Sequence, residues 1–235
     1  MQASRIFIAA FPKAGSSFAT NVLCDYTGYA EHKYAEPGMH KDLVVQRLRD
    51  GNAFPHVVKQ HTVALPRNVA LIREFSLRPV VLVRNVFDCL LSLSEYLASY
   101  AEDNFLMPNV LHADAESRLR STVQFCAPFY VQFYISWWRA SQSGIETCWV
   151  SYEGMLADRG AFFTRILDFC GIRVHEGLPT SIARCDVRPE RPIENPNLFN
   201  VGLAGRGVDI PGDLQEYVRS LCAHFPEVDF SRMGV

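Results

Sequence analysis

The sequence predicts an α/β protein with a central parallel β-sheet flanked by helices. Two short, wholly apolar segments, residues 6–11 and 80–83, are typical of strands buried on both faces of a parallel sheet. Stretches with apolar residues at helical spacing alternate with such segments along the chain. Strands that alternate with helices are the order found in doubly wound α/β sheets.

Length and composition favour one folded domain, which we expect to span residues 1–235. The net charge of -2 gives nucleic acid no electrostatic support as a partner. Seven cysteines, an odd number without a C-x-x-C pair, favour reduced thiols in a cytoplasmic protein. The apolar run at the start is too short for a signal peptide, and no stretch approaches the ~20 apolar residues that cross a membrane.

The remaining elements follow from the same patterns. Strands are predicted over residues 6–11, 54–62, 80–83 and 147–151, and helices over residues 18–23, 41–49, 69–75, 86–100, 115–141, 161–170 and 213–224. Pro128 should break or kink the longest helix, predicted over residues 115–141. Gly171 should cap the helix predicted over residues 161–170. Residues 29–40 should be irregular, and residues 181–207 should form a long ordered loop. The aromatic stretch 125–138 fits either a buried amphipathic helix or the wall of a ligand pocket.

A short polar loop, residues 12–17 with the sequence PKAGSS, joins the first strand to the first helix. Such a loop binds phosphate, because the first N–H groups of the helix and the positive end of its dipole point to one place. Gly15 allows close approach of an anion, Lys13 adds a positive charge, and two serine hydroxyls add donors. A serine in such a loop can equally act only as a helix cap. The loop is not a Walker A loop, because its lysine precedes its only glycine.

Polar side chains follow three of the predicted strands. The 12–17 loop follows the first, Lys59 and His61 end the second, and Arg84 follows the third. Ligands of doubly wound sheets bind outside the carboxyl ends of the strands. We therefore expect these groups to form one site at that edge of the sheet.

With these residues in view, the sequence resembles the sulfotransferases that use 3′-phosphoadenosine-5′-phosphosulfate (PAPS). Residues 12–18 look like the family's 5′-phosphosulfate loop, P-K-[SA]-G-[TS]-[TS]-[WF]. Residues 81–92 look like its 3′-phosphate motif, in which a serine follows an arginine by eight positions. Residues 58–61 are similar to the segment with the catalytic histidine, and residues 150–156 resemble the Y-E-D-L stretch whose tyrosine lies near the adenine. The motifs occur in family order.

The resemblance implies a P-loop-like nucleotide-binding core of the sulfotransferase type. His61 would be the general base, since the unperturbed pKa of histidine is about 6.5. Lys13 and Lys59 would stabilise charge on the leaving phosphate and the sulfuryl oxygens. The residues implied in cofactor binding are Pro12, Lys13, Ala14, Gly15, Ser16, Ser17, Phe18, Arg84, Ser92, Tyr152, Gly205, Arg206 and Gly207.

The implied reaction transfers the sulfuryl group of PAPS to a hydroxyl or amine of a small-molecule acceptor. No metal is implied, because no cluster of His, Cys and Asp has ligand spacing. Loops over residues 29–40, 100–112 and 182–199 would build the acceptor pocket, so the acceptor cannot be identified from the sequence. The oligomeric state stays open, with a homodimer as one option.

Residues 200–207 depart from the family's C-terminal motif, R-K-G-x-x-G followed by an acidic residue and tryptophan. The glycines are present, but the arginine, lysine and tryptophan are not. Arg206 is a candidate for the missing 3′-phosphate contact from a shifted position. Residues 18–24 contain no carboxylate, which fits His61 as the base of a small-molecule enzyme.

Two other functions remain open at this point. A nucleotide kinase or other P-loop phosphotransferase would need a G-K-[ST] loop and acids that hold magnesium. A non-catalytic nucleotide-binding module on the same fold would lose nothing when His61 is replaced.

Overall fold

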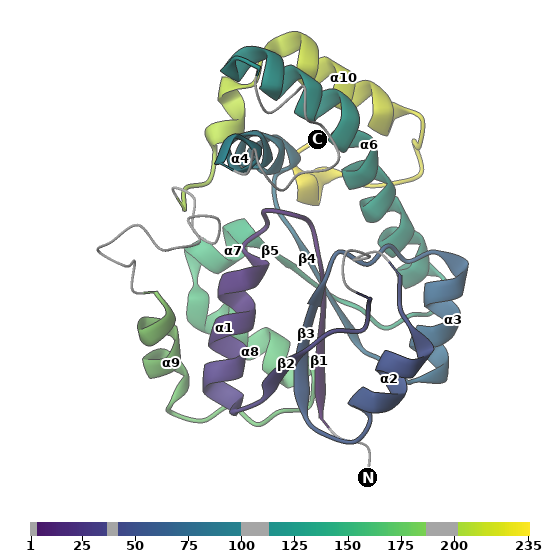
Figure 1. The fold of residues 1–235 in the computed structure, drawn as a ribbon, viewed down its shortest axis with the longest axis vertical. Coiled ribbons are helices and arrows are strands. Elements are labelled where there is room, and N and C mark those ends of the chain that lie inside the picture. Colours follow the sequence, from purple (N-terminus) through teal and green to yellow (C-terminus); the bar gives the residue numbers. More distant parts are fainter. Residues whose placement is uncertain (1–3, 37–41, 100–112, 187–201) are drawn as a thin grey trace. The chain divides into compact units, whose positions relative to one another are not determined.

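A parallel β-sheet of five strands organises the computed structural model, which describes residues 4–36, 42–99, 113–186 and 202–235 (Figure 1). The strands are β1 (Arg5–Ala10), β2 (Ala30–His32), β3 (His56–Gln60), β4 (Pro79–Val83) and β5 (Cys148–Ser151). Their order in the sheet is β2-β3-β1-β4-β5, and every pairing is parallel. The predicted α/β class with a central parallel sheet is confirmed.

The apolar runs in the sequence form the centre of this sheet. Residues 6–10 of β1 are at most 1% exposed, and every residue of β4 is buried. Both strands have neighbours on each side and helices over each face, so they need apolar side chains in both directions. In the register of the sheet, Ile8 of β1 lies opposite Lys59 of β3 on one side and Val80 of β4 on the other.

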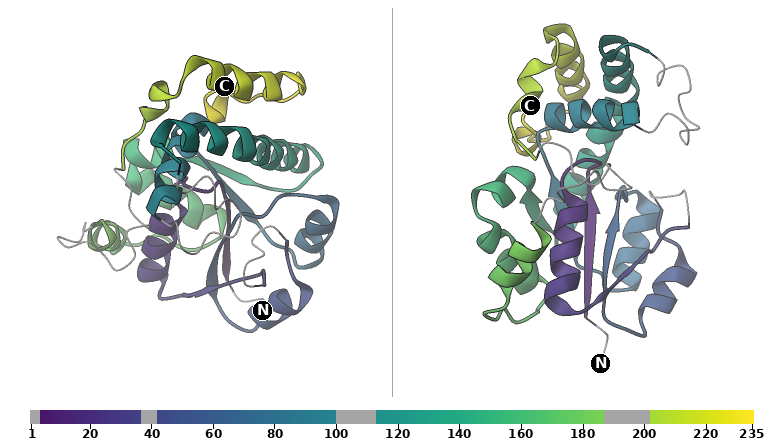
Figure 2. Two further views of the ribbon diagram at one scale, coloured as in Figure 1. Left: turned by 45° about the horizontal axis from the view of Figure 1, so that its top comes forward. Right: turned by 60° about the vertical axis from the view of Figure 1, so that its left-hand side comes forward.

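Helices cover both faces of the sheet, with α1 and α8 on one face and α2 and α3 on the other (Figure 2). The helices are α1 (Ser16–Thr27), α2 (Val45–Gly51), α3 (Pro66–Glu74), α4 (Val86–Ser99), α6 (Ala115–Gln142), α7 (Tyr152–Ala157), α8 (Arg159–Phe169), α9 (Leu178–Cys185) and α10 (Gly212–Ala223), with short 3₁₀ helices η1 (Arg206–Asp209) and η2 (Ser231–Met233). No helix within these described ranges is both long and apolar enough to span a membrane.

Three helices begin within a few residues of the end of a strand, and a local feature marks the start of each. Gly15 precedes α1 in the left-handed conformation, with φ of 81°. The Asn85 side-chain oxygen accepts the N–H groups of Phe87 and Asp88 at 3.0 and 3.2 Å and so begins α4 after β4. The Ser151 hydroxyl accepts the Gly154 N–H at 3.1 Å and begins α7 after β5.

Several expectations about the elements were wrong. The segment 29–40, expected to be irregular, contains the short edge strand β2, which pairs with β3. The expected loop over 181–207 begins within α9, contains η1, and for residues 187–201 lies outside the described residues. Of the two effects expected of Pro128, the break is wrong, since α6 is one helix from Ala115 to Gln142, and the kink stays a prediction. For the aromatic stretch, in contrast, the interpretation as a buried helix is confirmed for most of its length, since Tyr130, Phe133, Tyr134 and Trp137 are fully buried while Phe125 is exposed.

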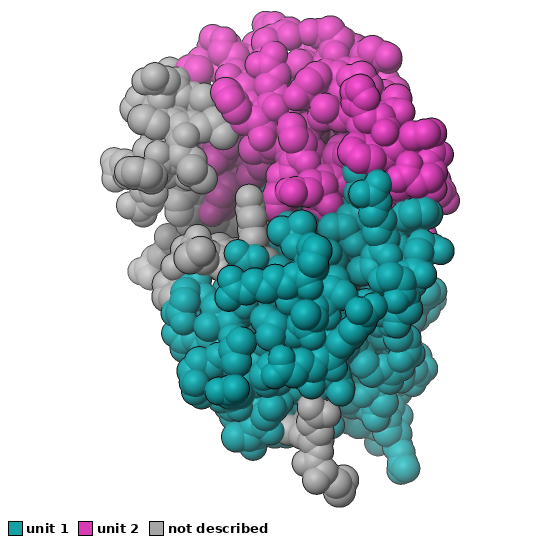
Figure 3. All heavy atoms as spheres, turned by 90° about the vertical axis from the view of Figure 1, so that its right-hand side faces the viewer, with its two compact units in different colours: residues 1–83, 135–187 teal, residues 84–134, 188–235 magenta. Residues whose placement is uncertain are grey.

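The structure divides into two compact units (Figure 3). Unit 1 consists of residues 1–83 and 135–187 and contains the whole sheet. Unit 2 consists of residues 84–134 and 188–235 and contains α4, most of α6, η1 and α10. The extent of a single domain over residues 1–235 stays a prediction.

A histidine is buried at the start of β3 in unit 1. His56 has no exposed surface; its Nε2 lies 2.7 Å from the Tyr34 hydroxyl and its Nδ1 lies 2.8 Å from the Phe54 carbonyl oxygen. Burial lowers the pKa of His56, an effect that the Phe54 carbonyl opposes and that His32 and Arg5 reinforce. The folded protein therefore favours the neutral imidazole.

We predict that His56 makes the protein less stable in acid. Because its pKa is lowered on folding, the unfolded chain binds the proton first as the pH falls below about 6.5, and the free energy of unfolding then decreases. His56→Gln should lower stability at about pH 8 through lost packing, but this deficit should shrink at about pH 5. Urea unfolding of both proteins at both pH values measures the change, and an equal deficit at the two pH values contradicts the assignment.

Candidate active site

The 12–17 loop leaves the carboxyl end of β1 in an unusual backbone conformation. Lys13 has φ of 64° and Gly15 has φ of 81°, both in the left-handed region. A non-glycine residue held there costs about 1–3 kcal/mol and is found most often at functional sites. Left-handed residues in such a loop turn successive N–H groups toward one point, which is how backbone binds anions.

The loop lies at the switch point of the sheet. β1 continues through α1 to β2 on one side of the sheet, whereas β4 continues through α4 and α6 to β5 on the other. Ala10 of β1 lies opposite Leu82 of β4, and the Phe11 N–H donates to the Leu82 carbonyl at 3.0 Å. The carboxyl ends at such a reversal of strand order are where α/β sheets bind ligands.

Lys59 lies beside the loop. It belongs to β3, and its Nζ donates to the Ser17 hydroxyl at 3.0 Å. Burial lowers the pKa of Lys59; Glu31 opposes this shift and Lys33 adds to it. An ammonium group that has lost part of its hydration interacts more strongly with an anion that enters the same site.

His61 follows the end of β3 and is fixed by the backbone of β1. Its Nδ1 lies 2.8 Å from the carbonyl oxygen of Ala10, the last residue of β1. A carbonyl oxygen only accepts hydrogen bonds, so Nδ1 carries the proton. In the neutral ring Nε2 then holds the lone pair, which is the arrangement of a general base.

Tyr152 packs against the loop from the start of α7. A Cβ atom placed on Gly15 would lie 2.8 Å from Cδ2 of the buried Tyr152 ring and 3.0 Å from Cε of Met155. Glycine is therefore required at position 15 for its contacts as well as for its left-handed backbone. Phe18, on the first turn of α1, packs against the Phe163 ring at 6.1 Å.

The Phe18 ring has a second neighbour that the sequence did not indicate. The guanidinium carbon of Arg159 lies 5.3 Å from the centre of the Phe18 ring. Arg159 is the first residue of α8, and its guanidinium also pairs with Asp186. Unit 1 thus brings together the 12–17 loop, Lys59, His61, Tyr152 and Phe18.

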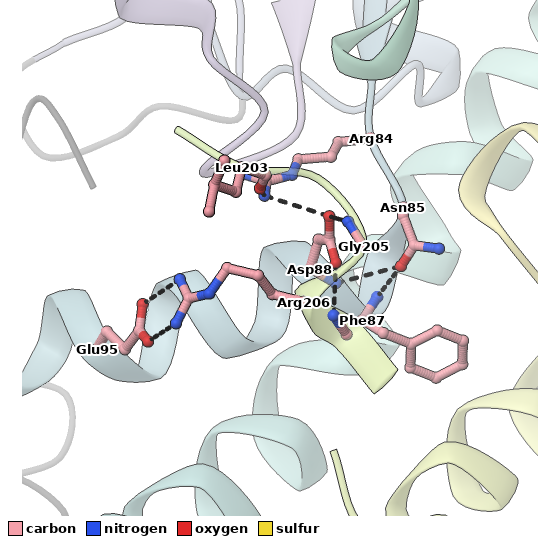
Figure 4. A network of polar contacts seen from close by, with 9 residues as sticks. Arg84, Asn85, Phe87, Asp88, Glu95, Leu203, Gly205 and Arg206 are labelled. Atoms are coloured by element: carbon pink, nitrogen blue, oxygen red, sulfur yellow. Dashed lines mark hydrogen bonds and ion pairs between the residues drawn. The ribbon is translucent and has the colours of Figure 1, made fainter. Parts of the chain in front are cut away.

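Unit 2 contains the other predicted residues, beginning with Arg84. The side chain of Arg84 is buried, and its Nη2 donates to Asp88 Oδ2 at 3.3 Å and to the Leu203 carbonyl at 2.8 Å (Figure 4). Ser92 is also buried, about one helical turn after Asp88 on α4. Arg84 and Ser92 thus lie in the same unit, as the motif requires.

The predicted glycine segment lies against α4. The N–H groups of Gly205 and Gly207 donate to the Asp88 carboxylate at 2.8 and 2.6 Å (Figure 4). The Arg206 guanidinium forms a two-point ion pair with Glu95 of α4. Sequence reasoning did not single out Asp88 or Glu95, and the phosphate contact expected of Arg206 stays a prediction.

Some expectations lie beyond what the structure describes. Residues 100–112, 187–199 and 37–40, which belong to the expected acceptor loops, are outside the described residues. Across the described residues, no three His, Cys, Asp or Glu side chains gather where they could hold a metal ion. The expected absence of a metal stays a prediction.

A sulfotransferase domain model matches residues 3–186, and the chain therefore belongs to the sulfotransferase family and is an enzyme of the transferase class. Comparison with curated protein sequences gives no match. Among solved structures, the chain is similar to mouse sulfotransferase SULT7A1 complexed with PAP, with 14% identity and a TM-score of 0.67 over 95% of this chain and 84% of that chain.

Two structures of retinol dehydratase are also similar. One is in complex with androsterone and inactive cofactor PAP, with 13% identity and a TM-score of 0.62. The other is in a complex with retinol and PAP, with 14% identity and a TM-score of 0.58. Each match covers 95% of this chain and 81% of the retinol dehydratase chain. At identities of 13–14%, the similarity to these structures shows a shared fold and nothing further.

We predict that Gly15→Ala destabilises the protein far more than Gly28→Ala. The two glycines flank α1 with φ of 81° and 70°, but a Cβ on Gly28 would meet nothing within 4 Å. Both substitutions incur the left-handed backbone cost of about 1–2 kcal/mol. Only Gly15→Ala adds a clash with Tyr152, which raises its cost by about 1–3 kcal/mol. Denaturant unfolding measures both losses, and equal losses would show that Tyr152 does not confine the loop.

Proposed function

We infer that this sulfotransferase uses PAPS as its donor and transfers the sulfuryl group to a hydroxyl or amine of a small-molecule acceptor. The observation that carries this proposal is the position of a phosphate-type loop beside two polar groups. Lys59 bonds to Ser17 of the loop, and His61 is anchored to Ala10 at the start of the loop. Similar structures contain PAP, and two contain the small molecules androsterone and retinol, which supports this choice of donor and acceptor class.

The loop and the lysines would hold the phosphosulfate end of the donor. PAPS supplies an activated sulfuryl group whose departure leaves charge on a phosphate. Lys13 and the loop N–H groups stabilise this charge, and Lys59 neutralises the sulfuryl oxygens. By analogy with phosphoryl transfer, the transition state is loose, so most of the rate enhancement comes from positioning and charge stabilisation.

His61 would remove the proton of the acceptor. The acceptor oxygen or nitrogen forms a bond to sulfur while the bond from sulfur to the phosphate oxygen breaks. The proton of the acceptor passes to Nε2 of His61, since Nδ1 donates to the Ala10 carbonyl. That backbone bond also keeps the ring in one orientation before the acceptor binds.

The remaining predicted residues would bind the adenosine 3′-phosphate end. Phe18 offers an aromatic ring for the adenine, and Tyr152 packs at the loop next to it. Arg84 and Ser92 of unit 2 would hold the 3′-phosphate, through a planar guanidinium and a hydroxyl. Gly15 and Ser16 would contribute mainly N–H groups. Pro12, which has no N–H, and Ala14, whose N–H donates to the Phe11 carbonyl at 3.3 Å, would contribute the shape of the loop.

The cellular location, oligomeric state and acceptor of the protein remain expectations. We expect a cytoplasmic location, because the seven cysteines, all of which lie in the described part of the chain, form no disulfide. A homodimer and the identity of the acceptor are untested. The kinase alternative still lacks a G-K-[ST] loop, since Gly15 is followed by serine.

A thermal-shift titration tests the donor. We predict stabilisation by adenosine 3′,5′-bisphosphate well above that by 5′-AMP or by ATP with magnesium. A ligand at about 100 times its Kd stabilises the folded state by roughly 2.7 kcal/mol, which is measurable as a rise in Tm. A shift with ATP and magnesium alone would contradict the proposal and favour a kinase. No shift with any nucleotide would contradict donor binding.

We predict that His61→Ala lowers kcat by about 10²–10⁴-fold and leaves the Kd for adenosine 3′,5′-bisphosphate within about twofold of wild type. The reason is that His61 acts on the acceptor proton and not on the nucleotide. Sulfate transfer from PAPS to a panel of phenols, alcohols and amines measures turnover. His224→Ala, which removes an exposed imidazole at the end of α10, is the matched control and should keep full turnover. A His61→Ala protein with normal turnover excludes His61 as the base.

A further inference from the structure

Two carboxylates of α4 hold the 202–207 segment in unit 2. Asp88 accepts N–H groups from Gly205 and Gly207, and Glu95 pairs with Arg206 between them in sequence (Figure 4). These three contacts join parts of the chain that are more than 110 residues apart, since they span 111 to 119 positions. The segment is therefore fastened to α4 at two separate points.

Asp88 is the more deeply buried of the two points. Its side chain is 1% exposed, and its two oxygens receive both glycine N–H groups and the Arg84 guanidinium. A buried carboxylate is costly unless each oxygen is paired, so a site that buries one depends on keeping its partners in place. The position of the glycine backbone is thus linked to the position of Arg84.

The segment approaches α4 too closely for any side chain. A Cβ on Gly207 would lie 2.5 Å from Cβ of Phe87 and 2.9 Å from the backbone nitrogen of Asp88. Gly205 has φ of 84°, in the left-handed region. The close contacts and the hydrogen bonds to Asp88 together leave this backbone little room to move.

The same segment also orients Arg84 directly. The Leu203 carbonyl and Asp88 Oδ2 both accept hydrogen bonds from Nη2 of Arg84, at 2.8 and 3.3 Å. One nitrogen of the planar guanidinium is thereby fixed from two sides, and this sets the plane of the whole group. A change that shifts the segment must turn Arg84.

We propose that Asp88 and Glu95 are positioning residues for recognition of the 3′-phosphate. They fasten residues 202–207 to α4, and the fastened segment holds Arg84 in the orientation that binds this phosphate. Arg206 acts through its ion pair with Glu95, as part of the fastening. This inference rests on the proposed function, because it assumes that Arg84 meets a 3′-phosphate.

Asp88→Asn tests the contact at Asp88, the more deeply buried of the two carboxylates. An amide keeps the shape of the side chain, but its NH₂ group cannot accept the N–H groups that both oxygens of Asp88 now accept. We expect the Kd for adenosine 3′,5′-bisphosphate to rise about tenfold or more, while the Kd for 5′-AMP, which has no 3′-phosphate, stays within about twofold. Isothermal titration calorimetry with both nucleotides gives the ratio. A merely structural defect would weaken both nucleotides alike and would overturn the proposal.

A steric variant keeps the test decisive if Asp88→Asn does not fold. Gly207→Ala displaces the segment from Phe87 without changing any charge, and it should reduce the preference for the 3′-phosphate in the same way. Gly212→Ala in the same unit is the matched control, because a Cβ there meets nothing within 4 Å. An unchanged preference in Gly207→Ala overturns the proposal.

A double-mutant cycle tests the Glu95–Arg206 pair. Glu95→Gln and Arg206→Gln should each weaken binding of the bisphosphate by a similar factor, and the double variant should be no weaker than either alone. If Arg206 instead bound the phosphate directly, Arg206→Gln would weaken binding while Glu95→Gln would not, and the proposed role of Glu95 would be wrong.

Failure of the inference and failure of the proposed function give different results. If wild-type protein does not prefer the bisphosphate over 5′-AMP, the proposed donor is wrong. If wild type shows the preference and Asp88→Asn keeps it, the donor stands and the positioning role is wrong.

Discussion

The parallel pairing of β1 with both β3 and β4 is the constraint on which the site in unit 1 depends. It places Ala9 opposite Gln60 and Ala10 opposite Leu82, so the carboxyl ends of the three strands coincide. The Lys59–Ser17 and His61–Ala10 bonds follow from this register. Because side chains alternate along a strand, a slip of one residue would turn Lys59 to the other face of the sheet. The apolar strand interiors prevent that slip, since it would need their tightly packed side chains to exchange faces.

The sequence was most informative where structure is local. The sequence predicted β1, β3, β4 and β5 to within about two residues. For β1 and β4 this is expected, because strands buried on both faces need continuous apolar runs. β2 was missed because it has only three residues and none of them is buried, so the sequence shows no apolar strand pattern there. The 12–17 loop could be predicted as a candidate phosphate-binding loop because all of its residues are consecutive in the sequence.

The part of the candidate site that was missed depends on contacts between distant segments. Asp88 lies four residues after Arg84, and in the sequence this spacing resembles an ordinary ion pair on a helix surface. Its defining partners, Gly205 and Gly207, lie 117 and 119 positions away, and no local pattern connects them. Arg159 was missed for the same reason, because only the packing of α8 near α1 brings it to Phe18. The sequence indicated the glycine segment, but it did not indicate Asp88, the carboxylate to which the glycine N–H groups donate.

The cationic side chains of the two units differ in their partners, which are a neutral hydroxyl in unit 1 and carboxylates in unit 2. In unit 1, Lys59 is an ammonium bound to a neutral hydroxyl, so its full charge acts on an anion beside the loop. In unit 2, both arginines of the predicted site face carboxylates, Arg84 facing Asp88 and Arg206 facing Glu95. A guanidinium has five N–H donors in a fixed plane, so Arg84 can hold a carboxylate on one edge and still present donors of defined direction on another. An ammonium paired in this way would lose that directionality. In the proposed function, recognition by unit 1 therefore relies on charge, whereas recognition by unit 2 relies on the orientation of a guanidinium that is already partly neutralised.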